Sequence, residues 1–259
     1  MILRAASYLL CFSLMAGCLL CPSFLSAAEK EPTEKDSAEP FTIVTFGDST
    51  TATRGPLVVY SMILEKELPE AGIPVKVINA GIGGNTTKNA VARFEKDVLE
   101  HQPQLVIIQF GINDSAVDVW RKPPATTSRV SQEQYAANLR ALIKQLQDKQ
   151  IAVILMTPNS MCWTANLKQT YGKPPYDPED PDGFNLFLKS YAETVRKIAK
   201  EEKLPLVDVY TAFENHAKGK KQSTRDLLLD GMHPNTAGQR MVADLLIPQI
   251  KQVLSKQDK

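Results

Sequence analysis

This sequence has few cysteines and few histidines, and its net charge is close to zero. Its 259 residues include four cysteines and three histidines, and the formal net charge at pH 7 is +1. Three of the cysteines, Cys11, Cys18 and Cys21, lie near the N-terminus, so only Cys162 belongs to the rest of the chain. A disulfide-rich scaffold is therefore excluded. We interpret Cys162 as a semi-buried small residue rather than a nucleophile, because free cysteines are usually of that kind.

Signals for binding metal, cofactor or nucleic acid are also missing. No CxxC or HExxH pattern occurs after Cys21, so the sequence predicts no metal site. Neither a basic stripe suited to nucleic acid nor an acidic tail is present. The Gly-rich stretch from Asn79 to Thr87 lacks the Lys-Ser/Thr pair of a P-loop. We expect no cofactor, no nucleic-acid partner and no stable protein partner.

Long apolar runs are confined to the N-terminus. A basic start, Met1 to Arg4, precedes the apolar segment from Ala5 to Leu20, and small residues follow at 26–28. This order is typical of an export signal, and the run is too short for a confident membrane span. We predict a signal peptide over residues 1–28. Residues 29–40 are charged and contain proline, which indicates a flexible spacer.

The fate of this signal leaves two alternatives open. Cleavage near Ala28 would give a mature start near Glu29. The stretch from Leu14 to Cys18 also resembles a bacterial lipobox, in which Cys18 would become a lipidated N-terminus, although Met15 is an unusual residue there. In either case we expect an exported protein that is periplasmic, extracellular or anchored by lipid in the cell envelope.

The remainder of the chain alternates between strand-like and helix-like segments, with no internal repeat and no long linker. Near-continuous Val/Ile/Leu runs alternating with helical patterns indicate a parallel sheet covered on both faces. We predict one α/β domain over residues 41–256, a three-layer α/β/α sandwich with five parallel strands. The expected strands are 41–46, 75–79, 105–110, 151–156 and 204–209. The expected helices are 57–70, 87–100, 131–149, 184–202 and 235–254, the last interrupted by Pro248.

Two longer stretches, 117–130 and 159–183, do not fit the alternation. Both follow strands at their carboxyl ends, where open parallel sheets bind ligands. They contain prolines and aromatic residues, among them Trp120 and Trp163. We interpret them as walls of a substrate site rather than as surface filler.

The first candidate for chemistry is Ser49, in the Gly-Asp-Ser-Thr stretch 47–50 directly after the first strand. A serine hydroxyl is a weak nucleophile and needs a base. Of the three histidines, His101 and His216 lie in stretches that indicate solvent exposure. His233 instead follows Asp230 by three residues, in a turn just before the last helix. Asp230 can then orient the imidazole, which leaves Nε2 free to accept the serine proton.

Acyl transfer also needs hydrogen-bond donors for the oxyanion. The loop after the second strand offers the backbone N–H of Gly84, and the segment 111–114 after the third strand offers the side-chain amide of Asn113. Each motif alone fits a cap or a turn equally well. All of them are expected at one edge of the sheet, and together they supply a nucleophile, a base, an orienting carboxylate and oxyanion donors.

These blocks resemble those of the SGNH, or GDSL, hydrolase family. Residues 47–50, 79–87, 111–114 and 230–234 match its four blocks in order and spacing, and the resemblance spans residues 41–254. It implies a flavodoxin-like sandwich, a catalytic triad of Ser49, Asp230 and His233, and an oxyanion hole of Gly84, Asn113 and the Ser49 N–H. Thr50 stands where the family name has Leu, as in several subgroups that include polysaccharide acetylesterases.

The resemblance implies a carboxylic ester hydrolase that works through an acyl-enzyme. Short-acyl, above all acetyl, esters of carbohydrates are the preferred substrates, since export and aromatic loops favour them. A lysophospholipase or thioesterase-like activity is the enzyme alternative. A non-catalytic glycan-binding protein on a hydrolase scaffold is the alternative of another class.

Overall fold

The structure is a computed structural model that describes residues 39–255. The predicted signal peptide, the lipobox at Cys18 and most of the predicted spacer lie outside the described residues. A single five-stranded sheet in the order β2-β1-β3-β4-β5 organises the fold, and every neighbouring pair is parallel. The strands are β1 (Phe41–Gly47), β2 (Val75–Gly81), β3 (Leu105–Gln109), β4 (Ala152–Met156) and β5 (Leu206–Val207).

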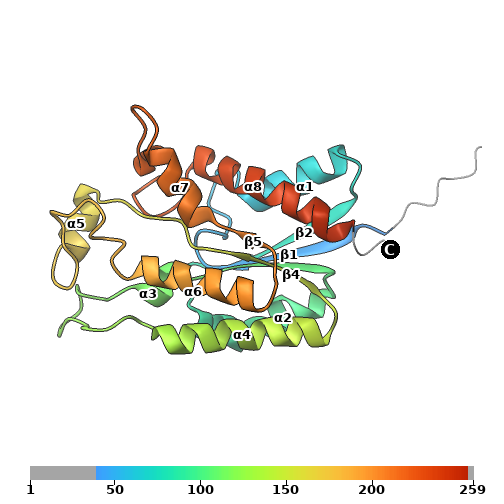
Figure 1. Ribbon diagram of the computed structural model, residues 1–259, viewed down its shortest axis with the longest axis horizontal. Coiled ribbons are helices and arrows are strands. Elements are labelled where there is room, and N and C mark those ends of the chain that lie inside the picture. Colours follow the sequence, from blue (N-terminus) through green and yellow to red (C-terminus); the bar gives the residue numbers. More distant parts are fainter. Residues whose placement is uncertain (1–38, 256–259) are drawn as a thin grey trace, which may run out of the picture. The chain divides into compact units, whose positions relative to one another are not determined.

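Helices cover both faces of the sheet and form the predicted three layers (Figure 1). On one face lie α1 (Tyr60–Glu70), α7 (Val209–Ala217) and α8 (Thr236–Leu254). On the other lie α2 (Thr87–Asp97), α4 (Gln132–Asp148) and α6 (Leu188–Glu201). Two short helices, α3 (Ile112–Ser115) and α5 (Ala165–Tyr171), follow β3 and β4. Two 3₁₀ turns are η1 (Leu99–His101) and η2 (Thr224–Leu227).

Alternation along the strands divides the core between the two faces. Val44 and Phe46 of β1 pack with the α2, α4 and α6 side, whereas Ile43 of the same strand packs with the α1, α7 and α8 side. All five residues of β3, the central strand, are buried. Such a strand has no solvent-facing side, which explains its apolar run from Leu105 to Ile108.

The predicted fifth strand, 204–209, is longer than the observed one. Beyond Val207, Asp208 caps α7, because its carboxylate accepts a hydrogen bond from the Thr211 N–H at 3.1 Å. A helix thus begins where the pattern predicted strand, and the sequence analysis missed α7. The short helices α3 and α5 were missed as well.

The expected interruption of the last helix at Pro248 is wrong. α8 continues from Thr236 to Leu254 with Pro248 inside it. Proline lacks the N–H that would donate to the Asp244 carbonyl one turn earlier. Both residues lie on the exposed side of the helix, so water can satisfy that carbonyl. Within residues 39–255, no helix has the length and apolar character needed to cross a membrane.

Two glycines bring the turn after β1 tightly against the sheet edge. A Cβ at Gly47 would lie 2.2 Å from Thr51 Oγ1, and one at Gly81 would lie 2.3 Å from the Ala52 N. Any side chain at either position would push the 48–52 turn away from the strand ends. These close contacts fix the position of Ser49 relative to the sheet.

Candidate active site

Ser49 and His233 meet at the carboxyl edge of the sheet although 184 residues separate them. Ser49 follows β1, and its Oγ lies 2.9 Å from His233 Nε2. The turn that carries Ser49 is closed by the N–H groups of Thr51 and Ala52, which donate to the Asp48 carbonyl at 3.2 and 3.0 Å. The serine side chain therefore stands on a hydrogen-bonded turn within reach of a base.

The other imidazole nitrogen is held by Asp230. His233 Nδ1 lies 2.8 Å from Asp230 Oδ2, and the backbone N–H groups of Met232 and His233 donate to Asp230 Oδ1 at 3.0 and 2.9 Å. Burial alone would raise the pKa of Asp230, but these hydrogen bonds and the nearby imidazole hold it well below the ordinary value. An ionised Asp230 favours the tautomer with the proton on Nδ1, which leaves Nε2 free to accept.

A left-handed glycine makes this turn possible. Gly231 has φ +93°, and a Cβ there would lie 2.5 Å from the Cys162 carbonyl. The Gly231 carbonyl in turn accepts from the Cys162 N–H at 2.8 Å. The turn that carries Asp230 and His233 is thus fastened to the segment after β4.

Gln239, one turn into α8, links the histidine side of the site to the serine side. Its Oε1 accepts from the Tyr60 N–H at 2.8 Å, and its Nε2 donates to the Thr50 carbonyl at 3.3 Å. The side chain is buried. The helix that begins just after His233 is therefore bonded directly to the residue that follows Ser49.

Three donors in the segments that follow β1, β2 and β3 have no hydrogen-bond acceptor among residues 39–255: the N–H groups of Ser49 and Gly84 and the buried Nδ2 of Asn113. Gly84 has φ +76°, and the preceding Gly83 lies against Ser49, with 3.9 Å from its ideal Cβ position to Ser49 Cβ. Buried donors are rarely left unpaired. This arrangement suits a group that gains negative charge during a reaction.

Asp48, next to the serine, belongs to a separate buried network. Its Oδ1 accepts from the Thr50 N–H and hydroxyl, both at 2.9 Å, and Thr50 Oγ1 also lies 3.1 Å from Gln109 Oε1. Burial raises the pKa of Asp48, and this rise is opposed by the Thr50 hydrogen bonds, by His233 and by the amide of Asn113, which acts on the carboxylate from beyond hydrogen-bond distance. The threonine at the position where the family name has Leu thus supplies a hydroxyl to a buried carboxylate.

The remaining histidines lie away from this cluster. His101 is exposed, as predicted. His216 was expected to be exposed as well, but it is half-buried, with Nε2 3.7 Å from Asp226 Oδ2. It packs at the end of α7, a helix that the sequence analysis did not anticipate. In residues 39–255, no three His, Cys, Asp or Glu side chains converge as a metal-binding group.

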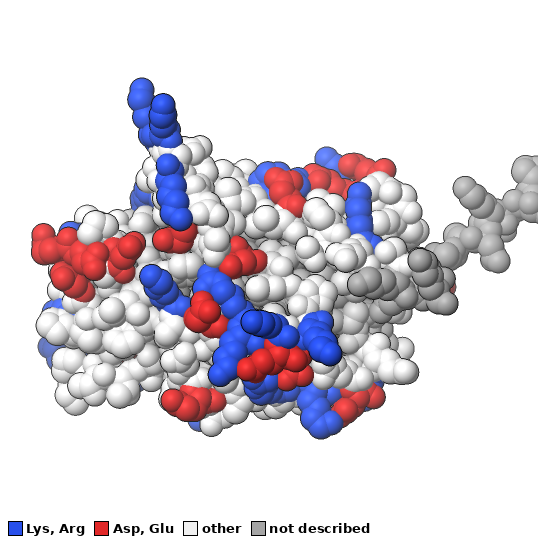
Figure 2. All heavy atoms as spheres, in the orientation of Figure 1, with Lys and Arg blue, Asp and Glu red and all other residues white. Residues whose placement is uncertain are grey.

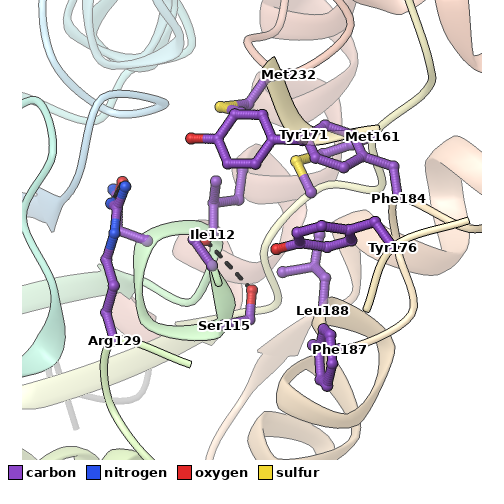
Figure 3. A pocket seen from close by; sticks show the side chains of 12 residues that line it. Ile112, Ser115, Arg129, Met161, Tyr171, Tyr176, Phe184, Phe187, Leu188 and Met232 are labelled. Carbon is purple, nitrogen blue, oxygen red and sulfur yellow. Dashed lines mark hydrogen bonds between the residues drawn. The ribbon is translucent and has the colours of Figure 1, made fainter. Parts of the chain in front are cut away.

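Both long loops contribute to a cavity of about 40 Å³ beside Asn113 (Figure 3). Its wall is mainly aromatic and aliphatic, and the Arg129 side chain is its charged member. The lining residues are Ile112, Asn113, Ser115, Ala116, Arg129, Met161, Tyr171, Tyr176, Phe184, Phe187, Leu188 and Met232. The structure thus places Tyr171 and Tyr176 of the 159–183 loop in the wall of a pocket beside the candidate site.

The two tryptophans do not line this cavity. Trp163 stacks on Phe184 with centroids 4.6 Å apart, and its Nε1 donates to the carbonyls of Asp177 and Asp180 at 3.2 and 3.0 Å. It therefore fastens the loop together. Trp120 is 49% exposed, with the Arg121 guanidinium 5.5 Å from its ring centroid.

His233 itself lines a second, open groove of about 540 Å³. It is lined by Thr164, Ala165, Asn166, Leu167, Arg225, Leu229, Asp230, Met232 and His233. Met232 lines both the cavity and the groove. The candidate site therefore has a small enclosed pocket on the Asn113 side and a wide open one on the His233 side.

Comparison with known families decides the assignment. Residues 45–241 match the model of the GDSL-like lipase/acylhydrolase family. The chain belongs to this family. The matched region contains all five residues that sequence analysis predicted for the site, and the fold is the α/β sandwich expected for an SGNH hydrolase. The protein is accordingly an ester hydrolase of the GDSL type.

Three comparisons illustrate the relationship. The chain is 30% identical over 191 residues to an acetylxylan esterase of Geobacillus stearothermophilus, covering 73% of this chain and 77% of the relative. It is 31% identical over 175 residues to a Bacillus subtilis protein named uncharacterized lipoprotein YqeF, covering 64% and 70%. The crystal structure of Axe2, an acetylxylan esterase from Geobacillus stearothermophilus, superposes with a TM-score of 0.65 at 26% identity, over 81% of this chain and 94% of that one.

Several residues at the site of this GDSL-type hydrolase were not singled out from sequence. Arg129 lies in the 117–130 loop, which was interpreted from its prolines and aromatic residues alone. Phe184, Phe187 and Leu188 were assigned to the start of a regular helix. Met232 stands between Asp230 and His233 without a pattern of its own. A clue was available for Arg129: it is a charged residue at the end of the loop that leads from Asn113 to the next helix.

Proposed function

We propose that this GDSL-type hydrolase is an exported esterase that removes short acyl groups, chiefly acetyl, from carbohydrates, with Ser49 as the nucleophile. The observation that carries the proposal is the unbroken hydrogen-bonded series from Asp230 through His233 to Ser49, at the same sheet edge as three donors that have no acceptor in the described part of the chain. That combination fits acyl transfer to serine and its reversal by water.

The reaction follows from this geometry. Ser49 Oγ attacks the ester carbonyl carbon while His233 Nε2 takes its proton, and Asp230 stabilises the imidazolium that forms. The negative charge on the carbonyl oxygen is held by the Ser49 N–H, the Gly84 N–H and Asn113 Nδ2. The C–O bond to the alcohol then breaks, and the alcohol leaves with the proton from His233. Water, deprotonated by His233, attacks the acyl-enzyme and releases the acid.

The two pockets favour a small acyl group on a larger alcohol. A cavity of about 40 Å³ holds a few atoms, as an acetyl group requires. The open groove of about 540 Å³ leaves room for sugar units on the side of His233, where the alcohol leaves. Acetylxylan esterases among the relatives add support to a carbohydrate ester.

Surface charge supports an uncharged substrate. Over the middle of the face in Figure 2, acidic and basic side chains lie close to one another. On α6, for example, Arg196 pairs with Glu193 at 2.8 Å and Lys197 with Glu201 at 4.0 Å. Interspersed charges give little long-range field to attract a charged polymer.

Export is proposed from the N-terminal signal pattern over residues 1–28. One relative is named a lipoprotein, which supports an envelope location. Lipidation at Cys18 and cleavage near Ala28 stay as two routes to that location.

The decisive experiment compares acetyl release from acetylated xylooligosaccharides with hydrolysis of p-nitrophenyl esters of two to sixteen carbons and of lysophospholipids. We expect activity with acetyl esters that falls steeply as the chain lengthens. Activity that rises toward long chains or lysophospholipids would favour the acylhydrolase alternative and overturn the substrate proposal.

The nucleophile is tested with Ser49→Ala and with Ser255→Ala, the same change at the exposed end of α8. Ser49→Ala should lose fluorophosphonate labelling and reduce kcat by several orders of magnitude, whereas Ser255→Ala should keep both. A wild-type protein that binds xylooligosaccharides but neither reacts with fluorophosphonate nor releases acetate would instead be a glycan-binding protein.

A further inference from the structure

Arg129 joins the side chain of Asn113 to a buried carboxylate. Its Nη1 donates to Asn113 Oδ1 at 3.0 Å, and its Nε and Nη2 donate to Asp118 Oδ1 at 3.0 and 2.7 Å. The Asp118 side chain is only 2% exposed, and its other oxygen is bound by Arg121 Nη2 at 2.7 Å. A guanidinium with three such bonds is held in one orientation.

This contact fixes which way the amide of Asn113 points. A guanidinium has donors and no acceptor. The amide atom that faces Arg129 must therefore be the oxygen, and the nitrogen must point the other way. That nitrogen, Nδ2, is the buried donor without a partner among the described residues. A rotation of the amide by half a turn would place the oxygen, an acceptor, where the oxyanion forms.

We propose that Arg129 is a positioning residue that keeps Asn113 Nδ2 directed at the oxyanion. The inference rests on the proposed function, since Asn113 has this role only if an acyl group is transferred there. Arg129 acts through Asn113 and not on the reacting atoms.

The loop that carries Arg129 is folded back on α3 by its own backbone. The Arg129 N–H donates to the Ala116 carbonyl at 3.0 Å, and the Val130 N–H donates to the Asp114 carbonyl at 3.1 Å. Ser128 Oγ adds a bond to the Ser115 carbonyl at 3.1 Å. The 117–130 stretch therefore returns to the helix that bears Asn113 and delivers Arg129 beside it.

A second reading of the same position must be separated from this one. Arg129 also lines the cavity beside Asn113 (Figure 3). A guanidinium there could contact the acyl group itself. The two readings differ in kinetics, because a direct contact to bound substrate alters KM, whereas a donor that acts only on the oxyanion alters kcat.

The test is a double-mutant cycle on purified full-length protein with p-nitrophenyl acetate. Removing one oxyanion donor typically lowers kcat by about 10²–10³-fold, which we expect for Asn113→Ala. Arg129→Met should lower kcat by about 10- to 100-fold, within that limit, with KM changed less than about twofold. In the Asn113→Ala background, Arg129→Met should lower kcat no further, because the group it positions is gone.

Arg121→Met is the matched control. The Arg121 side chain is 59% exposed and also binds Asp118. Its removal leaves the bond between Arg129 and Asn113 in place. We expect kcat within about twofold of wild type. A loss equal to that of Arg129→Met would mean that activity depends on the arginines balancing the charge of Asp118 and not on the bond to Asn113. That result would overturn the proposal.

Arg129→Lys covers the case in which the methionine variant does not fold. Lysine keeps the charge and a donor but cannot bridge both partners in the fork geometry of arginine. Its kcat should be intermediate, and this loss should also vanish in the Asn113→Ala background. The same factor of loss in both backgrounds, or a loss confined to KM, overturns the proposal. Full activity in Ser49→Ala would instead overturn the proposed function itself.

Discussion

At the scale of single residues, the site contains carboxylates with opposite electrostatic settings. Asp230 has half of its side chain exposed and is hydrogen-bonded to His233, which holds its pKa below the ordinary value. Asp114, the residue that follows Asn113 in the chain, is buried. Burial raises its pKa to about 6 even though Thr87 donates two hydrogen bonds to it. The first is ionised throughout the neutral range, whereas the second is the one that titrates near physiological pH.

Replacing Asp230 tests its orienting role. Asp230→Asn keeps the size of the side chain but removes the charge and permits the wrong imidazole tautomer. We expect kcat to fall about 10⁴-fold, the loss seen when a serine protease triad undergoes the same change. Asp148→Asn, at an exposed ion pair with Lys144, serves as the control and should retain full activity. Initial rates with p-nitrophenyl acetate measure both variants, and activity near wild type in Asp230→Asn would contradict the role.

Asp114 predicts a pH dependence of stability. Its folded pKa, about 6, lies above the ordinary 3.8, so the unfolded chain loses this proton first as the pH rises. The contribution of protonated Asp114 to the free energy of unfolding is therefore complete below about pH 4 and is lost as the pH rises through about 6. A shift of this size corresponds to roughly 3 kcal/mol. Urea unfolding at pH 4–8 should show Asp114→Asn gaining stability relative to wild type over this range. Parallel curves for the two proteins would contradict this origin of the pH dependence.

Thr50 tests the buried network beside the nucleophile. Thr50→Val keeps the shape but removes the hydroxyl that donates to Asp48. A buried acceptor that loses its donor costs about 1–3 kcal/mol. We expect the free energy of unfolding to fall by that amount in chemical denaturation. Thr170→Val, on the exposed helix α5, is the control, and an equal loss in both variants would argue against a special role for the buried hydroxyl.

At the scale of elements, two turns place the chemistry and a loop supports it. The 48–52 turn is pressed onto the ends of β1 and β2, and the 230–233 turn is fastened to the segment after β4 through Gly231. The stretch 117–130 returns to α3. Each of these connections lies at the carboxyl edge of the sheet, so distortion of any one of them should alter the geometry around Ser49.

Gly231 provides a test at this scale, with Gly72 as its matched control. Both have φ in the left-handed region, +93° and +82°, but a Cβ at Gly72 meets nothing within 4 Å, whereas one at Gly231 meets the Cys162 carbonyl at 2.5 Å. Gly72→Ala should cost about 1 kcal/mol of stability and leave activity intact. Gly231→Ala should cost more and also reduce kcat, as seen in denaturation and esterase assays. Equal effects would mean that the close approach is unimportant.

At the scale of the whole molecule, the sheet could be predicted because it is buried on both faces. The short apolar runs of β3 and its neighbours are typical of strands buried on both faces, and the site motifs come directly after the ends of these strands. Ser49, Gly84 and Asn113 were therefore found by their place after a strand. Asp230 and His233 were found because a glycine turn joins them just before the last helix.

What sequence did not reveal depends on contacts between distant segments. Arg129 reaches Asn113 only because the 117–130 loop folds back, and Trp163 turned out to fasten its loop rather than to line the cavity. α7 replaced the end of a predicted strand because Asp208 caps a helix there. His216 is half-buried because it belongs to the last turn of this helix. The Asp208 cap is a local signal, but the placement of Arg129 and Trp163 has no local pattern, since loop conformation follows from tertiary packing.

Export is a prediction about the entire chain. Expressed in a bacterial host, the protein should be recovered outside the cytoplasm, and removal of residues 1–28 should retain it inside. Cys18→Ala distinguishes the two routes: it should abolish incorporation of labelled fatty acid and release the protein from the membrane if Cys18 is lipidated, and change neither if cleavage occurs near Ala28. Cytoplasmic recovery of the full chain would contradict the signal assignment.

The bond that Gln239 makes with the turn after Ser49 also bears on timing. Asp230, His233 and the helix that follows them come late in the chain, while the serine comes early. During synthesis, the part of the chain that carries Ser49 emerges long before its base does. A nascent chain therefore cannot hydrolyse esters until its last helix has been made and has docked. Activity therefore begins only when synthesis of the chain is nearly complete.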